Sequence, residues 1–351
     1  MGNDSFMGRP APVIGAPMAG GPSTPELTAA VTNAGGLGFL AAGYLTAQAL
    51  MESMRRTREL TQGPFGVNLF VPEGPEHLAG GARSLEDSDL GRWFEYREFL
   101  SPFAQGLGVA LPGEPEWSDD DYGAKIELLA ADPPAVVSFT FGPPAPAVVE
   151  RFQGLGTLVV ANVASADDAA QAVALGVDAL CVQGPEAGGH RATYGAAAEP
   201  PDMPLVELIE ATAEAAGPPV IAAGGIATAE LAAVCLGAGA VAVQVGTAFL
   251  GALEAGTRTA HLAAIVSGAY VQTEVTRAFS GRPARALATE FTAAARQLSP
   301  ALYPELHFLT APLRSAAAAL NPSLLHLWAG TGFQAVRRAP AAQIVEALTP
   351  R

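Results

Sequence analysis

Cysteine, lysine and positive charge are scarce in this sequence of 351 residues. The two cysteines, Cys181 and Cys235, lie in apolar runs with no CxxC pair and no histidine at metal-ligand spacing. We therefore expect neither a disulfide framework nor a metal site. Basic residues number 19 and acidic residues 34, which gives a net charge of −15. Nucleic acids and anionic membranes are bound through basic surfaces, so neither is an expected partner.

Long apolar runs and a targeting segment are missing as well. No stretch approaches the ~18 uninterrupted apolar residues of a membrane span, and residues 1–10 lack the charged and apolar regions of a signal peptide. We therefore expect a cytoplasmic protein. Hydrophobic residues make up 50% of the chain and charged residues only 15%, which is typical of a globular enzyme with a large core.

Short β-rich runs alternate along the chain with helical runs rich in alanine and leucine. This rhythm predicts an α/β fold, a (β/α)8 TIM barrel, with a helical insertion after strand three and a helical subdomain after strand eight. The first helix is expected to be capped by Ser23 or Thr24. The expected strands cover residues 12–16, 36–41, 65–70, 135–140, 157–161, 178–182, 219–223 and 241–245, with helices at 46–60, 146–153, 166–175, 205–216 and 229–236 between them.

Two segments do not fit the repeat. Residues 1–250 and 326–351 are expected to form the barrel, and the acidic insertion at 73–131 within them is either a surface decoration or a lid. Residues 251–325 are expected to form the helical subdomain on the substrate side, over the barrel mouth. A helix at 334–348 would then complete the outer ring.

Glycine-rich turns follow the predicted strands at the end where barrels of this class carry their active sites. Gly224 and Gly225 follow strand seven, and Gly246 and Thr247 follow strand eight. Free backbone N–H groups at these two positions predict a pocket for a phosphate group. Each turn alone is equally compatible with a tight connection between strand and helix.

His190 ends a glycine-lined loop after strand six, behind Gly188 and Gly189. Histidine exchanges protons near neutral pH, so a catalytic role is the favoured interpretation, with simple hydrogen bonding as the alternative. Met18 follows strand one, where it either contacts a ligand or fills the core. Local positive charge for an anionic substrate is expected from Arg191, Arg277 and Arg282, unless these side chains are solvated at the surface.

Several separate motifs, in the same order, resemble the nitronate monooxygenase family, formerly called 2-nitropropane dioxygenase. They are residues 16–25, 65–70, 137–142, 186–190 and 222–226. The resemblance implies an FMN-dependent TIM barrel that oxidises alkyl nitronates of the propionate 3-nitronate class with O₂ and without NAD(P)H. It implies His190 as the catalytic residue and a flavin held by Ala16, Pro17, Met18, Asn68, Gln183, Gly188, Gly189, Gly224, Gly225, Gly246 and Thr247.

The resemblance leaves the exact chemistry of His190 open. In a nitronate the Cα proton is already gone, so the imidazole would orient or stabilise the bound anion, whereas for a neutral nitroalkane it would act as a base. Pro185 stands where the family pattern has a bulkier residue, which puts the identity of the substrate in doubt. Monomer and homodimer are equally compatible with the sequence.

Three other functions are compatible with the same motifs. A flavin-dependent enoyl-acyl-carrier-protein reductase has a similar histidine loop but needs NAD(P)H and an acyl channel. A flavin carrier without turnover would use only the phosphate pocket. An isomerase or synthase without flavin is the third, because a barrel fold does not by itself determine a function.

Overall fold

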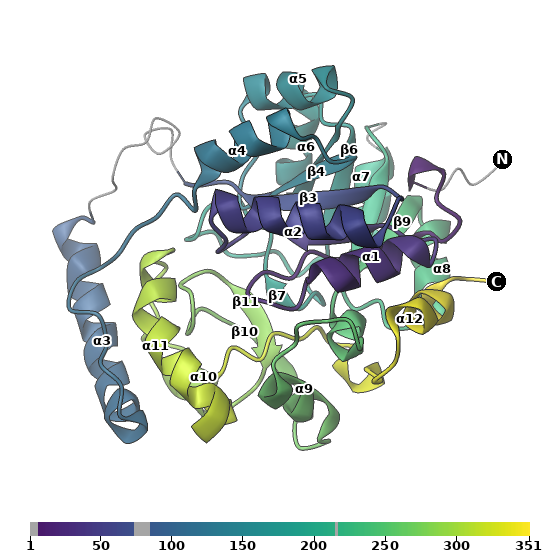
Figure 1. Cartoon of the computed structure of the whole chain (residues 1–351). Helices are drawn as coiled ribbons and strands as arrows, with labels where there is room; N and C mark the ends of the chain where they lie inside the picture. Colours follow the sequence, from purple (N-terminus) through teal and green to yellow (C-terminus); the bar gives the residue numbers. More distant parts are fainter. Residues whose placement is uncertain (1–5, 74–84, 215–216) are drawn as a thin grey trace.

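An eight-stranded parallel barrel forms the centre of the computed structural model, which describes residues 6–73, 85–214 and 217–351 (Figure 1). The strand order is β1, β9, β8, β6, β5, β4, β3, β2, and a parallel bridge between Ile14 and Leu37 closes the ring. The predicted barrel is confirmed. Its strands are β1 (Val13–Gly15), β2 (Gly38–Ala41), β3 (Phe65–Phe70), β4 (Val136–Thr140), β5 (Leu158–Val163), β6 (Ala179–Gln183), β8 (Val220–Ala223) and β9 (Ala240–Val245).

Helices connect consecutive strands and cover the outside of the barrel. Side-chain oxygens cap several of them, because the first N–H groups of a helix have no carbonyl partner. Thr24, one of the two predicted caps, accepts from the N–H of Leu27 at 3.0 Å, and Thr228 accepts from Leu231 at 3.3 Å. The outer helices are α1 (Pro25–Asn33), α2 (Ala47–Leu60), α5 (Pro146–Gly154), α6 (Ala166–Ala174), α7 (Leu205–Glu214), α8 (Ala229–Gly237) and α12 (Ala341–Leu348).

One predicted helix reaches the edge of the described residues, and another begins later than expected. The helix predicted at 205–216 is α7, and residues 215–216 lie outside the described part of the chain. The helix predicted at 334–348 begins only at Ala341, because Pro340 stands at its N-cap. A short 3-10 helix, η5 (Phe333–Ala335), and extended residues occupy the first part of the predicted range.

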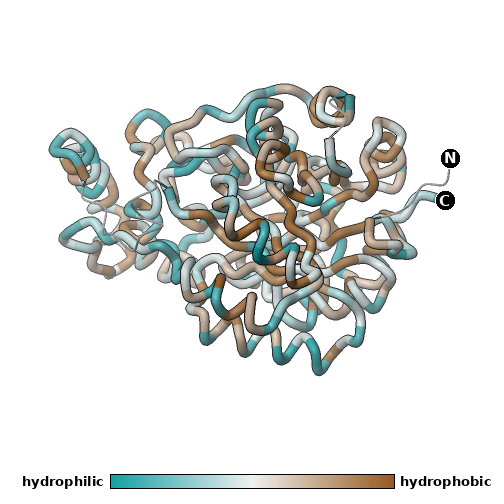
Figure 2. The backbone as a smooth tube through the Cα atoms, turned by 90° about the horizontal axis from the view of Figure 1, so that it is seen from above, coloured by the Kyte–Doolittle hydropathy of each residue, from teal (hydrophilic) through white to brown (hydrophobic). Residues whose placement is uncertain are grey.

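Alternate residues along each strand face two different hydrophobic layers. In β6, Ala179 and Cys181 belong to the cluster that fills the inside of the barrel, which also includes Phe6, Ile14 and Phe39. Leu180 and Val182, from the same strand, belong to the larger cluster between the strands and the outer helices. Figure 2 shows hydrophobic segments running through the middle of the molecule. The buried cluster that contains Ala179 and Cys181 therefore fills the inside of the barrel with side chains.

The insertion after β3 contains α3 (Asp87–Leu107) and α4 (Tyr122–Ala131), while residues 74–84 lie outside the described part of the chain. Figure 1 shows α3 beside α11 (Glu305–Leu320), away from the barrel strands. Trp93, Tyr96 and Leu100 of α3 are fully buried in one cluster with Phe279 and other residues that follow the barrel. Helix α3 is thus packed into the core of the segment that follows β9.

The segment after β9 contains the predicted helices and also two strands that sequence analysis did not predict. Its elements include η3 (Thr247–Gly251), α9 (Thr259–Val266), β10 (Thr273–Thr276), β11 (Ala284–Leu287), α10 (Glu290–Ala295), α11 and η4 (Pro322–Leu324). Strand β11 pairs in an antiparallel manner with β10 and with β7 (Gly189–His190). This second sheet attaches the segment to the loop that carries His190. The division of the chain into a barrel and a helical subdomain stays a prediction.

Membrane-spanning helices were not expected from the sequence. Among the helices that the structure describes, none combines the length and the apolar character needed to cross a membrane.

Candidate active site

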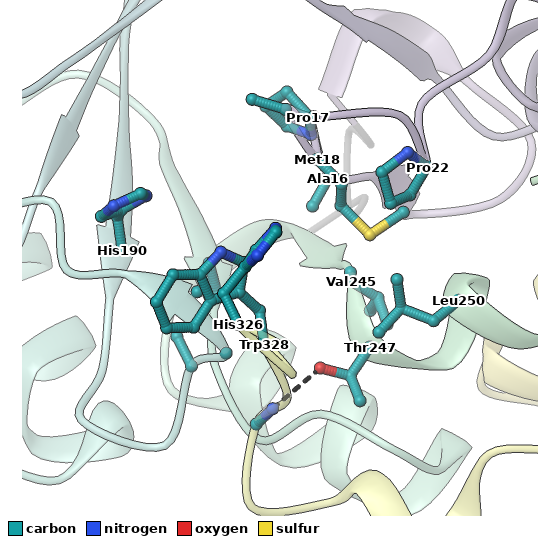
Figure 3. Close-up of a pocket in the computed structure, with 18 of the residues that line it drawn as sticks. Ala16, Pro17, Met18, Pro22, His190, Val245, Thr247, Leu250, His326 and Trp328 are labelled. Atoms are coloured by element: carbon teal, nitrogen blue, oxygen red, sulfur yellow. Dashed lines mark hydrogen bonds between the residues drawn. The ribbon is translucent and has the colours of Figure 1, made fainter. Parts of the chain in front are cut away.

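A cavity of about 410 Å³ opens at the carboxyl ends of the barrel strands. The predicted site residues come from the carboxyl-terminal parts of β1, β3, β6, β8 and β9 and from the loops that follow them, and the structure brings all of them to the wall of this one cavity. In Figure 3, Met18 lies on the β1 side, Thr247 on the β9 side, and His190 across the cavity from both. The predicted site residues that line the cavity are Ala16, Pro17, Met18, Asn68, Gln183, Gly188, Gly189, His190, Gly224, Gly225, Gly246 and Thr247.

The cavity wall contains no aspartate or glutamate among the residues that the structure describes. The charged side chains among the described residues of this wall are Arg258 and Arg314, although the chain as a whole carries a net charge of −15. Low-dielectric walls strengthen the field of such local charges. The cavity therefore favours anions inside a strongly acidic protein.

Glycine is required where the loops after β6 and β8 meet. Gly224 and Gly225 have φ of 125° and 66°, which favours glycine, and a Cβ on Gly225 would lie 2.8 Å from Cβ of Glu186. A Cβ on Gly188 would overlap the backbone of Gly330. The loops therefore present bare backbone to the cavity. Exposed N–H groups in this arrangement can hold a phosphate at the position where barrels commonly bind one.

The loop after β1 is held in place by Ser23. Its Oγ accepts a hydrogen bond from the N–H of Met18 at 2.8 Å and lies 3.4 Å from the carbonyl oxygen of Ala16. The thioether of Met18 points toward Gly246, where a Cβ would lie 3.6 Å from its sulfur. Met18 therefore lines the cavity and also packs against the barrel core, and its contact with a ligand stays a prediction.

Two amide side chains in the cavity wall behave differently. Nδ2 of Asn68 donates to the hydroxyls of Ser138 and Thr140, each at 2.9 Å, which leaves its Oδ1 to accept a hydrogen bond from a ligand. Both ends of the Gln183 amide are engaged within its own loop. Its Nε2 donates to the carbonyl oxygen of His190 at 3.0 Å, and its Oε1 accepts from the N–H of Ala192 at 2.9 Å. Gln183 thus shapes the loop that carries His190.

His190 is held between a serine and three aromatic rings. Its Nε2 lies 2.8 Å from Oγ of Ser280, and its ring centroid lies 5.4 Å from Trp328, 5.5 Å from Phe141 and 6.1 Å from Tyr303. Burial lowers the pKa of His190 to about 3, and the charges of nearby arginines act in the same direction. The imidazole is therefore neutral at physiological pH, a hydrogen-bonding group of low basicity.

The far wall of the cavity comes from α11 and the residues after it, and α11 belongs to the segment expected on the substrate side. His307 stacks on Tyr44 with 4.0 Å between ring centroids, and Arg314 contacts both His307 and His326. Burial lowers the pKa of both histidines well below the ordinary value. No motif in the sequence identifies these residues, because only the packing of α11 against the barrel mouth brings them to the cavity.

None of the three arginines expected to supply positive charge lines the cavity. Arg282 is buried, pairs with Glu73 at 3.3 Å and places its guanidinium 4.1 Å from the ring centroid of Phe141. Arg277 binds the loop after His190 and pairs with Glu199 at 2.8 Å. Arg191 is buried against the side chain of Gln183. These arginines fix the loops around the cavity, and Arg258 and Arg314 supply its charge.

A metal site is not found within the described ranges. No group of three histidine, cysteine or carboxylate side chains there is arranged to hold a metal ion. Both cysteines are free and buried.

The fold and the cavity define an α/β barrel with a ligand site at the carboxyl ends of its strands. The family model described as "Nitronate monooxygenase" matches residues 7–351. The chain therefore belongs to the nitronate monooxygenase family, and it is an enzyme, an oxidoreductase that acts on a small molecule. It is 36% identical over 350 residues to a nitronate monooxygenase of Paraburkholderia phytofirmans, covering 98% of this chain and 92% of that one.

Solved structures show the same similarity. A nitroalkane oxidase from Streptomyces ansochromogenes superposes with a TM-score of 0.89 and 41% identity, covering 97% of this chain and 95% of that one. FabK from Thermotoga maritima superposes with a TM-score of 0.73 and 25% identity, covering 97% and 92%.

Proposed function

We propose that this enzyme oxidises alkyl nitronates with O₂, using FMN and no NAD(P)H. The observation that carries the proposal is a neutral His190 facing a cavity that has arginines and no carboxylate within the described residues. A nitronate is an anion, so it gains from this charge distribution. The nitronate monooxygenase and nitroalkane oxidase similarities support the same class of substrate.

The residues present fit FMN. Glycines at 188, 224 and 225 leave a backbone cradle that a Cβ would fill, and such a cradle accepts a phosphate through N–H groups. Oδ1 of Asn68 is available to accept a hydrogen bond from a flavin N–H, and the Met18 thioether offers a soft apolar contact. The rest of the predicted set is Ala16, Pro17, Gln183, Gly189, Gly246 and Thr247. FMN, when bound, accepts the electron that the nitronate loses.

His190 holds the nitronate rather than removing a proton. A base needs a pKa near the working pH, and the pKa of His190 is lowered to about 3. A neutral imidazole still donates or accepts one hydrogen bond at each ring nitrogen, which suits orientation of an anion whose Cα proton is already gone. We therefore propose that nitronates are preferred over neutral nitroalkanes.

Anaerobic reduction tests the proposal and separates it from the reductase alternative. Purified protein is mixed without O₂ with propyl nitronate or with NADH, and the visible absorbance of the flavin is recorded. We expect bleaching by the nitronate and none by NADH. Bleaching by NADH alone favours an enoyl-acyl-carrier-protein reductase, a stable yellow protein with both reagents favours a flavin carrier, and a colourless protein that takes up no added FMN removes the flavin assignment.

A further inference from the structure

The insertion after β3 is attached to the barrel mouth by two neighbouring aspartates. Oδ1 of Asp120 accepts a hydrogen bond from the backbone N–H of Tyr44 at 2.8 Å, and Oδ2 of Asp121 accepts one from the N–H of Ala47 at 3.2 Å. Both aspartates immediately precede α4, which lies beside α2 (Figure 1). Ala47 begins α2 on the outside of the barrel, whereas Tyr44 lines the cavity. Asp120 therefore connects the insertion to the cavity wall.

Tyr44 adopts a backbone conformation that usually requires glycine or asparagine. It follows Gly43 in a turn that is closed by a hydrogen bond of 3.1 Å from the N–H of Leu45 to the carbonyl oxygen of Ala42. At this third position of the turn φ is 66°, in the left-handed region. A bulky side chain is strained there, and such strain persists only where surrounding contacts impose it. The hydrogen bond to Asp120 is a contact that holds this conformation.

A buried ion pair keeps the carboxylate of Asp120 in place. Its Oδ2 lies 2.8 Å from Nζ of Lys125, whose side chain is 1% exposed. The N–H of Asp120 also donates to Oγ of Ser118 at 3.0 Å. A buried pair of opposite charges is costly to break, because one ion would be left without its partner. Asp120 is therefore a fixed acceptor for the N–H of Tyr44.

The conformation of Tyr44 places its ring beside the α11 wall of the cavity. The ring stacks on His307 with 4.0 Å between centroids, and Oη of Tyr303 donates to Oη of Tyr44 at 3.3 Å. The ring centroid of Tyr303 in turn lies 6.1 Å from that of His190. Because Oη of Tyr44 accepts from Tyr303, its own proton is available to donate to a ligand in the cavity. A displacement of Tyr44 therefore changes the wall that a substrate contacts.

We propose that Asp120 is a positioning residue that fixes Tyr44 on the cavity wall, where the hydroxyl of Tyr44 helps to bind the substrate. This inference rests on the proposed function and adds that the insertion after β3 shapes the substrate pocket. Asp120 is not among the described residues that line the cavity, so it acts on the substrate only through Tyr44. Loss of this contact should therefore weaken substrate binding more than it slows the chemical step.

Steady-state oxygen uptake with propyl nitronate by the holoenzyme tests the contact. Asp120→Gly removes the acceptor, and glycine tolerates the φ of 59° at this position. We expect it to raise KM about fivefold, the effect of one lost hydrogen bond, and to change kcat by less than about twofold. Asp120→Asn keeps an acceptor and should retain most of the wild-type affinity. Asp121→Gly is the matched control and should leave KM unchanged, since Asp121 also has a positive φ, of 54°, and accepts a backbone N–H outside the cavity.

Double variants separate positioning from general damage to the fold. Tyr44→Phe should raise KM by a similar factor, and adding Asp120→Gly to it should raise KM no further, because Asp120 acts through Tyr44. Asp120→Gly leaves the buried amine of Lys125 without its partner, so Asp120→Gly and Asp120→Asn are also compared in a Lys125→Met background. The difference between them should persist there. An unchanged KM in Asp120→Gly, an equal effect of Asp121→Gly, or multiplied effects with Tyr44→Phe overturns the proposal.

A titration that needs no substrate tests the inference apart from the proposed function. Burial raises the pKa of Tyr44 to about 12. When Asp120→Gly releases this side chain, one additional tyrosine should ionise near the ordinary pKa of about 10. The ultraviolet absorbance of tyrosinate measures this, and the added signal should be absent when Tyr44→Phe accompanies Asp120→Gly. Identical titration curves for Asp120→Gly and the wild type overturn the positioning role, whereas a wild type that does not oxidise propyl nitronate contradicts the proposed function alone.

Discussion

Nε2 of His190 lies 2.8 Å from Oγ of Ser280, a residue in the turn between β10 and β11. The backbone N–H of Arg282 also lies 3.4 Å from this hydroxyl, so the serine is held by its own turn. Strand β7, which carries His190, pairs with β11 immediately after that turn. The segment beyond the barrel therefore fixes the orientation of the imidazole.

Ser280→Ala should lower kcat for a nitronate by about fivefold, because it removes one hydrogen bond of about 1 kcal/mol that orients the imidazole. Flavin content and KM should change little, since Ser280 does not belong to the glycine cradle. Oxygen uptake and the visible spectrum measure both quantities. Ser53→Ala, on the exposed face of α2, is the control. An unchanged kcat would show that the packed aromatic rings alone orient His190.

His190→Asn should lower turnover of nitronates by about 100-fold, in the range typical of a lost catalytic side chain, while the protein stays yellow. Asparagine keeps a polar group but places it elsewhere in the cavity. Stopped-flow absorbance under anaerobic conditions measures the rate of flavin bleaching. Unchanged turnover with nitronates and with nitroalkanes alike would contradict the role given to His190.

Gly246→Asp should release most of the FMN, because it places a carboxylate beside the position proposed for the phosphate. Gly246 has an ordinary backbone conformation, and an added Cβ meets only van der Waals contacts of 3.5 Å or more. Gly246→Asn has the same size without the charge and is the matched control. The ratio of flavin absorbance to protein absorbance measures occupancy. Equal FMN occupancy in the two variants would show that a negative charge at this loop does not affect FMN binding, which would contradict the proposed position of the phosphate.

Stability should fall as the pH drops below about 6.5, the ordinary pKa of histidine. Burial lowers the pKa of His190 to about 3 and that of His261 to about 4, and those of His307 and His326 lie well below the ordinary value. Below pH 6.5 the unfolded chain therefore binds more protons than the folded one, so this stabilisation is complete above that pH and is lost beneath it.

Urea unfolding at pH 7.5 and 5.5 measures this effect on the free energy of unfolding. One buried neutral histidine accounts for about 1.4 kcal/mol at pH 5.5, so the loss from several should exceed that value. His261→Gln should reduce this loss of unfolding free energy by about 1.4 kcal/mol, the contribution of one histidine. The same free energy of unfolding at the two pH values would contradict the neutral state assigned to these side chains.

Local sequence patterns were sufficient for the barrel and for one side of its cavity. Each strand is followed directly by its loop, so Met18, Asn68, Gly224 and Gly246 could be placed at the carboxyl ends before the fold was known. Ser23 and Thr24, which precede a helical run, were likewise predicted as alternative caps of α1, and Thr24 is the cap. These features involve residues that are adjacent in the sequence, so the sequence alone is sufficient to predict them.

The opposite side of the cavity depends on contacts that no local pattern reveals. Arg314 lies in an alanine-rich helix, where nothing in the neighbouring residues separates a cavity cation from a solvated one. Strand β7 is two residues long and exists only because β11 pairs with it. Ser280 and Trp328 meet His190 through this pairing, so their proximity follows from the tertiary structure alone.

The most direct test of the central claim is oxygen uptake by the purified yellow protein with propyl nitronate, with and without NADH. We expect rapid uptake with the nitronate at the same rate in both conditions, and none with NADH alone. Uptake that requires NADH, or no uptake from a flavin-loaded protein in either condition, would contradict the claim.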